Sequence, residues 1–209
     1  MTIQFFITGK EKRASEVTTK SLQHLVESEK IMWAYIQEKD EAYIYPNQIK
    51  VLGGRTDFVC IIPNGSTVNS HIITIFKKYC EDKETIYLPL VVLTNEKAKG
   101  VLNSCLWNTN LAQEVGVLDD KLASKQIDTT LYGAFIPYAV LFDITNYNSE
   151  LKYYQHFYFL NQVTQTKLVK GIPKTLLYTD IDLTFSHVEE QEKIEYFKMA
   201  TKIKTLEIA

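Results

Sequence analysis

The 209-residue chain contains little of what marks a metal-bound or disulfide-stapled protein. Its three cysteines, Cys60, Cys80 and Cys105, lie far apart, so the C-x-x-C spacing of a zinc or redox site is absent. An odd cysteine count without a signal-like amino terminus predicts reduced thiols and a cytoplasmic or other intracellular location. There, the match of residues 64–66 to the glycosylation pattern is a chance occurrence.

Long apolar runs and an excess of positive charge are also missing. Apolar stretches such as 133–142 include proline and tyrosine and fall well short of the roughly 18 residues that cross a bilayer. We therefore expect a soluble protein without membrane insertion. Lysine and arginine number 23 against 25 aspartates and glutamates, a formal net charge of −2. This balance gives no attraction to phosphate backbones, so we expect no nucleic-acid partner.

The chain does have enough apolar sequence for one sizeable core. Hydrophobic residues make up 45% of it and aromatic residues 12%, and its length matches one domain better than two. No repeat, low-complexity stretch or Pro/Gly-rich linker divides it. We predict a domain over residues 1–185 and a carboxyl-terminal helix over 186–209 that packs on it or extends from it.

The amino-terminal part of the chain alternates between strand and helix patterns. Residues 3–8 and 31–37 are rich in β-branched and aromatic side chains, which predicts two buried strands. Between them, Ser15 can cap a helix that ends near Ser28. A strand, a helix and a second strand in this order are typical of a parallel sheet.

A third apolar run, 57–62, is closed by the turn residues 63–66. Apolar residues then recur at helical spacing over 72–80, and Asn69 or Ser70 can cap this helix. The run and the periodic segment predict a strand followed by a helix with one buried face.

Two later segments contain proline inside an apolar pattern. Residues 86–93 predict a strand in which Pro89 favours an edge position or a bulge. Residues 131–141 predict one more strand and a turn around Pro137.

Three further elements are predicted toward the carboxyl end. They are an aromatic helix over 150–162, a short strand over 175–179 that follows Gly171 and Pro173, and a helix opened by the capping box of Ser186 and Glu189. All elements together predict one α/β domain with a mixed, mainly parallel sheet between helices.

Four segments carry a family resemblance. The strand 31–37 runs into the acidic cluster 38–41 (Glu-Lys-Asp-Glu), and Gly-Arg-Thr-Asp-Phe-Val at 54–59 leads into the third strand. Tyr-Gly-Ala-Phe-Ile-Pro at 132–137 and the aromatic helix at 153–163 follow. This order resembles the GT-A fold of family 2 glycosyltransferases, which transfer a sugar from a nucleotide diphosphate donor to an acceptor. The resemblance implies a single GT-A-like domain.

The resemblance also implies where a nucleotide sugar would bind. After the third strand the family has a D-x-D motif, whose carboxylates hold Mg²⁺ or Mn²⁺ against the donor diphosphate. Here the uncharged Asn64, Gly65 and Ser66 stand at that place, so we expect the metal site to be missing. Asp40 and Glu41 are the implied contacts for uracil or ribose, with a solvated turn as the alternative.

The family's base is an aspartate in a Glu-Asp pair on the later helix. The matching positions hold Gln155 and His156. Glutamine cannot accept a proton, whereas a histidine with an ordinary pKa of about 6.5 can do so near neutrality. The alternative for His156 is a packed, hydrogen-bonded histidine among aromatic neighbours.

Asp180, Asp182 and His187 are the remaining candidate metal ligands. The two aspartates have D-x-D spacing but follow the last predicted strand rather than the third. A polar loop is the alternative account of these residues.

Two functions follow from the resemblance. In the first, the domain has lost catalysis and acts as a binding or structural assembly module, in a viral particle for example, with protein or glycan partners and no cofactor. In the alternative, it is an active transferase that uses a nucleotide-sugar donor, with Mn or Mg as its cofactor, or that holds the donor phosphates with backbone N–H groups of Asn64 and Gly65 and uses His156 as base. The missing carboxylates favour the first.

Overall fold

The computed structural model describes residues 1–29, 31–37, 49, 56–95, 100–103, 130–143, 156, 159–160, 163 and 167–180. The strands of these residues form two four-stranded sheets. The first sheet contains β1 (Ile3–Gly9), β2 (Met32–Gln37), β3 (Phe58–Pro63) and β7 (Ile136–Pro137) in the order β2-β1-β3-β7.

Strand β1 lies in the middle of the first sheet and pairs in parallel with β2 and with β3. Helix α1 (Glu16–Glu29) connects β1 to β2, so the predicted strand-helix-strand unit is confirmed. Strand β3 is buried along its whole length, as its continuous apolar run predicts for a strand covered on both faces. Strand β7 pairs with β3 in the antiparallel direction and makes the sheet mixed.

The second sheet contains β4 (Thr67–Val68), β5 (Ile86–Leu93), β6 (Gly100–Leu102) and β8 (Val169–Thr179) in the order β4-β8-β5-β6. Strands β5 and β8 are parallel, whereas β6 and β4 pair with them in the antiparallel direction. Single bridges from Tyr132 to Ile61 and from Phe135 to Tyr87 connect the segment 130–135 to both sheets. The described part of the chain is thus a mixed α/β domain.

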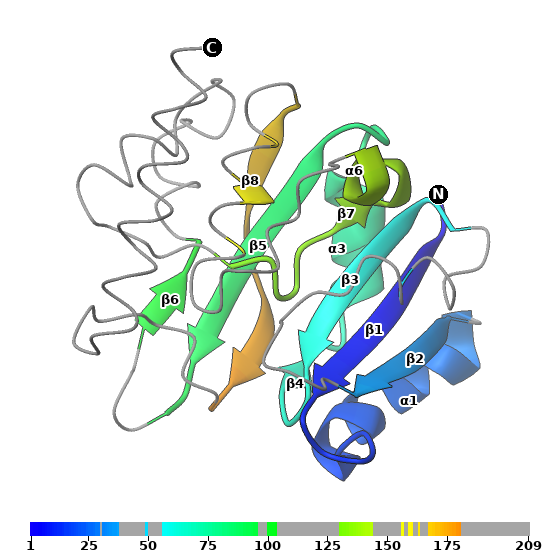
Figure 1. Ribbon diagram of the computed structural model, residues 1–209, viewed down its shortest axis with the longest axis vertical. Helices are drawn as coiled ribbons and strands as arrows, with labels where there is room; N and C mark the ends of the chain where they lie inside the picture. Colours follow the sequence, from blue (N-terminus) through cyan, green and yellow to red (C-terminus); the bar gives the residue numbers. More distant parts are fainter. Residues whose placement is uncertain are drawn as a thin grey trace.

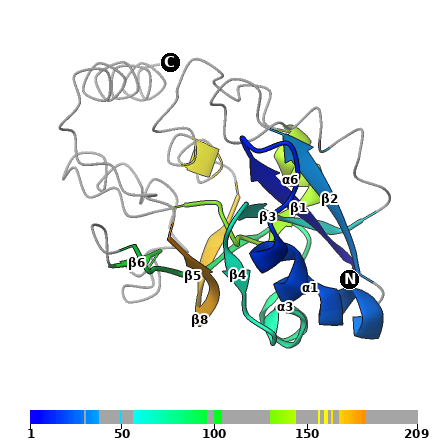
Figure 2. The same ribbon diagram turned by 90° about the horizontal axis from the view of Figure 1, so that it is seen from below.

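Helices cover the strands on two sides. Figures 1 and 2 show α1 and α3 (Ile72–Tyr79) on one side of the first sheet and α6 (Tyr138–Asp143) on the other. The core between the layers is aromatic: the Phe76 ring of α3 lies 5.2 Å from the rings of Phe58 and Phe135. Tyr87 of β5 approaches Phe58 at 6.3 Å. These contacts join both sheets to α3 through one core.

The two prolines inside apolar patterns behave differently from each other. Pro89 lies in β5, between β8 and β6, so the predicted edge position is wrong; the alternative of a bulge is confirmed by register shifts on either side of Leu90. The strand predicted within 131–141 is present but short, since β7 has two residues; the turn predicted around Pro137 is wrong, because Pro137 ends β7 and α6 begins directly after it. A proline just before a helix loses no helical hydrogen bond, which makes it a favourable helix start.

Two other expectations need correction. Neither Asn69 nor Ser70 is the N-cap of α3: His71 occupies that position without a side-chain cap, and Asn69 Oδ1 accepts from the His71 N–H at 2.8 Å. Strand β8 begins at Val169, six residues before the predicted start at Thr175. Pro173 was expected to precede the strand, but it falls where β8 slips in register against β5, and a bulge tolerates the missing N–H.

Several predictions lie outside the described residues. These are the helix over 186–209 and most of the helix over 150–162. Within the latter range, residues 156, 159 and 160 are described as helical, as is the following residue 163. Within the described segments, no helix has both the length and the apolar character needed to cross a bilayer.

Candidate functional site

Three parallel strands end at the same edge of the first sheet. Gly9 of β1 lies opposite Gln37 of β2, and Thr8 lies opposite Pro63 of β3. We call this end the carboxyl edge; it includes the segment 10–15 after β1 and the turn after β3. In open α/β sheets, ligands bind beyond the carboxyl ends of the strands, so we expect a ligand site at this edge.

The Asn64 side chain joins the turn after β3 to the segment after β1. Its Oδ1 accepts a hydrogen bond from the Ser15 N–H at 2.7 Å. Its Nδ2 donates to Glu11 Oε2 at 2.8 Å and to the Arg13 carbonyl at 3.3 Å. The Asn64 backbone N–H donates to the Thr8 carbonyl at 2.7 Å. Both N–H groups of the amide and its oxygen therefore have partners within the protein, with one of the two oxygen lone pairs engaged by Ser15.

The next two residues of the turn are held in the same way. The Gly65 N–H donates to Ser15 Oγ at 3.1 Å and to Thr18 Oγ1 at 2.9 Å. The Thr18 hydroxyl donates to the Ser66 carbonyl at 2.9 Å, and the Ser66 N–H donates to the Pro63 carbonyl at 3.2 Å. Gly65 has a φ of +95°, a conformation that favours glycine. We call the whole set the Asn64 network: Glu11, Arg13, Ser15, Thr18, Asn64, Gly65 and Ser66.

This network leaves the turn few groups for a ligand. The backbone N–H groups of Asn64, Gly65 and Ser66 all donate to protein oxygens, so a phosphate would have to displace an existing bond to reach them. Ser66 is fully buried and its side chain offers nothing to solvent. These contacts give the three predicted nucleotide-binding residues a structural role; their contact with a nucleotide stays a prediction.

A side chain of β2, Tyr35, also forms hydrogen bonds at this edge. The Tyr35 hydroxyl lies 3.1 Å from the Gly9 carbonyl and 2.7 Å from the Glu11 carbonyl, both acceptors. Gly9 itself is closely surrounded: a Cβ there would lie 2.6 Å from Asn64 Cβ and 2.7 Å from Glu11 Oε2. The backbone of β1 therefore approaches Asn64 at a distance that only glycine permits.

Glu11 is the acidic residue of the segment 10–15, where Lys10, Lys12 and Arg13 are its charged neighbours in sequence. The hydrogen bond from Asn64 lowers the pKa of Glu11 from its ordinary value, because it stabilises the ionised form. The residues at the D-x-D place do not fit a divalent cation, which takes several oxygen ligands with carboxylates among them. Asn64 Oδ1 already accepts from Ser15, and its Nδ2 presents hydrogens rather than lone pairs. Among the described residues, no three histidine, cysteine, aspartate or glutamate side chains lie where they could share a metal ion.

His156, the candidate base, is packed against the segment that links the two sheets. Its Nδ1 accepts from the Leu131 N–H at 3.3 Å and lies 3.1 Å from the Thr130 hydroxyl. The Tyr132 ring meets the imidazole edge-on at 4.7 Å. Burial of the ring lowers the pKa of His156 to about 3, so the side chain is neutral near pH 7 with its Nδ1 lone pair engaged. These contacts support the packed alternative, and a role as base stays a prediction.

Of the remaining candidates, Asp180 alone lies among the described residues. Asp40, Glu41, Asp182 and His187 lie outside the described residues. Asp180 follows β8 and is exposed, and its carbonyl accepts from Asn95 Nδ2 at 2.8 Å. The metal role of the Asp180, Asp182 and His187 trio therefore stays a prediction.

Comparisons with known proteins give no match to a family model and no match to a curated protein sequence. They do find solved structures. TarS of S. aureus, a family 2 glycosyltransferase, matches with a TM-score of 0.59 in its complex with UDP-GlcNAc and 0.58 in its complex with UDP. The identities are 12% and 11%, and each match covers 97% of this chain. The chain has a GT-A-like glycosyltransferase fold.

The match covers only part of the TarS structures. The chain spans 65% and 66% of the two TarS structures, slightly less than two thirds of each. A197 from STIV aligns over 90% of this chain and 100% of its own, with 12% identity and a TM-score of 0.49. At these identities a match shows the fold, while the activity has to be argued from the residues at the site.

Sequence reasoning missed the partners of Asn64. Ser15 was expected as a helix cap, and its hydroxyl does accept from the Thr18 N–H at 3.3 Å, but its contacts with the β3 turn were not expected. Glu11 and Tyr35 carried no signal at all, because their bonds to residues far away in sequence arise only when three strands end side by side.

Proposed function

We propose that this chain is a glycosyltransferase-like domain that has lost catalysis and acts as a binding or assembly module. The observation that carries the proposal is the Asn64 side chain. By the family resemblance it corresponds to the metal-binding carboxylates, and its amide is hydrogen-bonded to Ser15, Glu11 and Arg13. Stabilising a departing nucleotide diphosphate takes concentrated positive charge, usually from a metal ion. A hydrogen-bonded amide supplies none.

The position of His156 supports the same proposal. A general base needs a free lone pair and a pKa near the working pH. The Nδ1 lone pair of His156 faces the Leu131 N–H, and burial holds the pKa of the ring far below neutrality. Protein or glycan partners suit a domain of this kind, and a place in a viral particle is one form the assembly could take.

The alternative is an active transferase with a nucleotide-sugar donor. One observation favours it: one of the matching TarS structures is a complex with UDP-GlcNAc. An active enzyme would have to place the donor phosphates with groups other than the Asn64 turn, or open the network on binding.

A turnover assay separates the two. The purified chain is incubated with UDP-GlcNAc and Mn²⁺, and released UDP is measured over hours, with a reaction that lacks the protein as the blank. The proposal predicts no release above the blank. Release above the blank would establish the alternative; a metal chelator and the His156→Gln variant would then show whether it needs the metal ion and His156.

A further inference from the structure

Asn64 and Gly65 form the one Asn-Gly pair of the chain. Such a pair is chemically labile, because glycine has no Cβ that shields its backbone nitrogen from the amide carbon of the preceding side chain. The nitrogen of Gly65 can attack Cγ of Asn64 and close a five-membered imide ring. The turn after β3 therefore contains a candidate site of hydrolytic modification.

The reaction converts the Asn64 amide into a carboxylate without any change in oxidation state. Hydroxide removes the proton of the Gly65 N–H, the nitrogen forms a bond to Asn64 Cγ, and the bond from Cγ to Nδ2 breaks. Nδ2 leaves as ammonia and takes up a proton from water. A second water molecule then opens the imide: cleavage at Cγ gives aspartate, and cleavage at the backbone carbonyl carbon gives its isomer isoaspartate.

In the folded protein the nucleophile of this reaction is engaged. The Gly65 N–H donates to Ser15 Oγ at 3.1 Å and to Thr18 Oγ1 at 2.9 Å. Hydroxide has to displace both side-chain oxygens before it can remove the proton. The turn is also largely covered, because Asn64 is 9% exposed and Ser66 is fully buried.

The amide that would be attacked is held as well. Asn64 Oδ1 accepts from the Ser15 N–H at 2.7 Å, and Nδ2 donates to Glu11 Oε2 at 2.8 Å and to the Arg13 carbonyl at 3.3 Å. Ring closure moves Cγ to the Gly65 nitrogen and expels Nδ2, so it breaks these bonds. The Asn64 network therefore has to open before the reaction can occur.

We propose that Asn64 is a site of hydrolytic conversion to aspartate and isoaspartate, and that local opening of the Asn64 network controls its rate. The rate in the folded protein is then the rate in the unfolded chain multiplied by the fraction of molecules whose network is open. Both products lack the Nδ2 donor that faces Glu11, so the network does not re-form after conversion. The proposal is independent of the function proposed above, because it requires no ligand.

Peptide mass spectrometry measures the conversion, since replacement of the amide NH₂ by OH changes the mass of the peptide that contains Asn64. The intact protein is incubated near neutral pH, folded in buffer and unfolded in urea. We expect conversion in the folded protein to be slower by about a hundredfold, which corresponds to an opening free energy of about 2.8 kcal/mol. Equal rates in the two states would overturn the proposal.

Two valine variants test the control by the network. Thr18→Val removes the hydroxyl that accepts from the Gly65 N–H and donates to the Ser66 carbonyl. It should speed conversion in the folded protein by about fivefold, the equivalent of one hydrogen bond of about 1 kcal/mol. Thr8→Val is the matched control, because the buried Thr8 hydroxyl has no hydrogen-bond partner among the described residues. Equal rates for the two variants would overturn the proposal.

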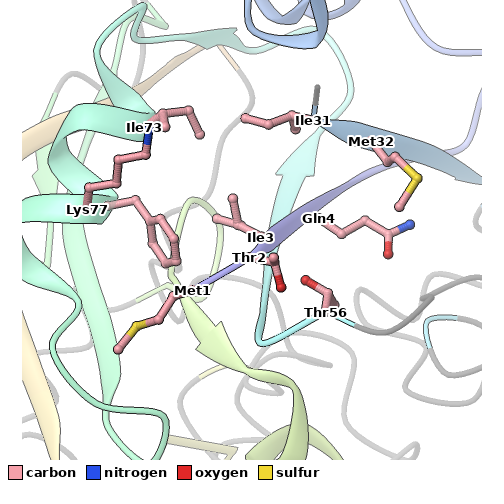
Figure 3. A pocket seen from close by; sticks show the side chains of 10 residues that line it. Met1, Thr2, Ile3, Gln4, Ile31, Met32, Thr56, Ile73 and Lys77 are labelled. Atoms are coloured by element: carbon pink, nitrogen blue, oxygen red, sulfur yellow. The ribbon is translucent and has the colours of Figure 1, made fainter. Parts of the chain in front are cut away.

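A variant far from the turn separates local opening from unfolding of the whole domain. Ile73 lines a pocket of about 220 Å³ at the opposite end of the first sheet, where β1 and β2 begin, and Figure 3 shows it facing Ile31 across the pocket. Ile73→Val should cost about 1 kcal/mol of stability, about as much as Thr18→Val. We expect it to leave the conversion rate at that of the unaltered protein. An acceleration equal to that of Thr18→Val would place the reaction in the unfolded chain and overturn the local control.

Discussion

The two ends of the first sheet are built in opposite ways. At the carboxyl edge, β1, β2 and β3 are tied by the amide of Asn64 and the hydroxyls of Ser15, Thr18 and Tyr35. At the amino edge, where β1 and β2 begin, apolar side chains border a pocket at which Met1 and Met32 are exposed. In a GT-A-like fold the carboxyl edge is the expected place for a ligand; among the described residues here, its polar groups bind one another.

The comparison illustrates how an amide and a pair of carboxylates differ at such an edge. Two carboxylates repel each other until a cation or donors compensate them, which leaves a site ready to bind. An amide offers both donors and acceptors, so it can satisfy its neighbours without a ligand. The first two predictions test this at Asn64 and at the glycine that makes room for it.

Asn64→Asp should have the largest effect. It replaces the Nδ2 donor that faces Glu11 Oε2 at 2.8 Å with a second carboxylate oxygen. We expect a loss of about 3 kcal/mol in the free energy of unfolding at pH 7, since Glu11 and the Arg13 carbonyl lose a donor and the new buried carboxylate faces a like charge. The repulsion raises the pKa of the pair in the folded state, so the loss should shrink as the pH falls toward 4. Urea denaturation at several pH values measures it.

The double variant Asn64→Asp with Glu11→Gln controls for this explanation. The glutamine amide can donate to the new carboxylate, so much of the stability at pH 7 should return. A double variant as unstable as Asn64→Asp alone would show that repulsion from Glu11 is not the cause.

Gly9→Ala should destabilise by up to about 3 kcal/mol, because overpacking against a fixed neighbour costs about 1–3 kcal/mol and two atoms are met at once. The added methyl group would lie 2.6 Å from Asn64 Cβ. Gly100→Ala in β6 is the matched control, since a Cβ there has no atom within 4 Å. Equal midpoints of thermal unfolding for the two variants would contradict the close approach of the Gly9 backbone to Asn64.

Asn64→Ala should cost about 2 kcal/mol, the combined effect of losing the side-chain bonds to Ser15, Glu11 and Arg13. Ser66→Ala tests the adjacent side chain, whose buried hydroxyl has no hydrogen-bond partner among the described residues. That change should be neutral or slightly stabilising in chemical denaturation. If the two variants have the same free energy of unfolding, the side-chain hydrogen bonds of Asn64 add no measurable stability.

At the amino edge, where β1 and β3 begin, we expect a side-chain truncation to have a smaller effect on the free energy of unfolding. Asp57→Ala removes the acceptor of the Thr2 N–H and the partner of Lys83, and we expect a loss of about 1 kcal/mol that decreases at high salt. The bond from Lys83 lowers the pKa of Asp57, so its contribution is present above the unfolded pKa and is lost as the pH falls through the folded pKa. Glu84→Ala, which removes an exposed ion pair with Lys167, should change the unfolding midpoint less.

Much of the fold could be predicted from local patterns. The strands β1, β2 and β3 and the helices α1 and α3 were expected within a few residues, because each has a strong apolar period and turn residues at its end. Besides the wrong cap of α3, the mistakes are at prolines. Pro89 and Pro173 are accommodated by irregular pairing between β5 and β8, and such pairing depends on the partner strand rather than on the local sequence.

The site could be predicted only in part. The uncharged turn at 64–66 was visible, because residue types can be compared with a family motif directly. What the turn does instead was not visible: Glu11 and Ser15 reach Asn64 across about 50 positions of sequence. The role of His156 also depended on tertiary contacts, since Thr130 and Leu131 carry no pattern that points to a histidine.

The most direct test of the account is a calorimetric titration of the intact protein with UDP and with GDP, in the presence and absence of Mn²⁺. If Asn64 has replaced the metal-binding carboxylates, neither nucleotide should show binding that depends on Mn²⁺. Micromolar binding that appears with Mn²⁺ and disappears with EDTA would contradict it.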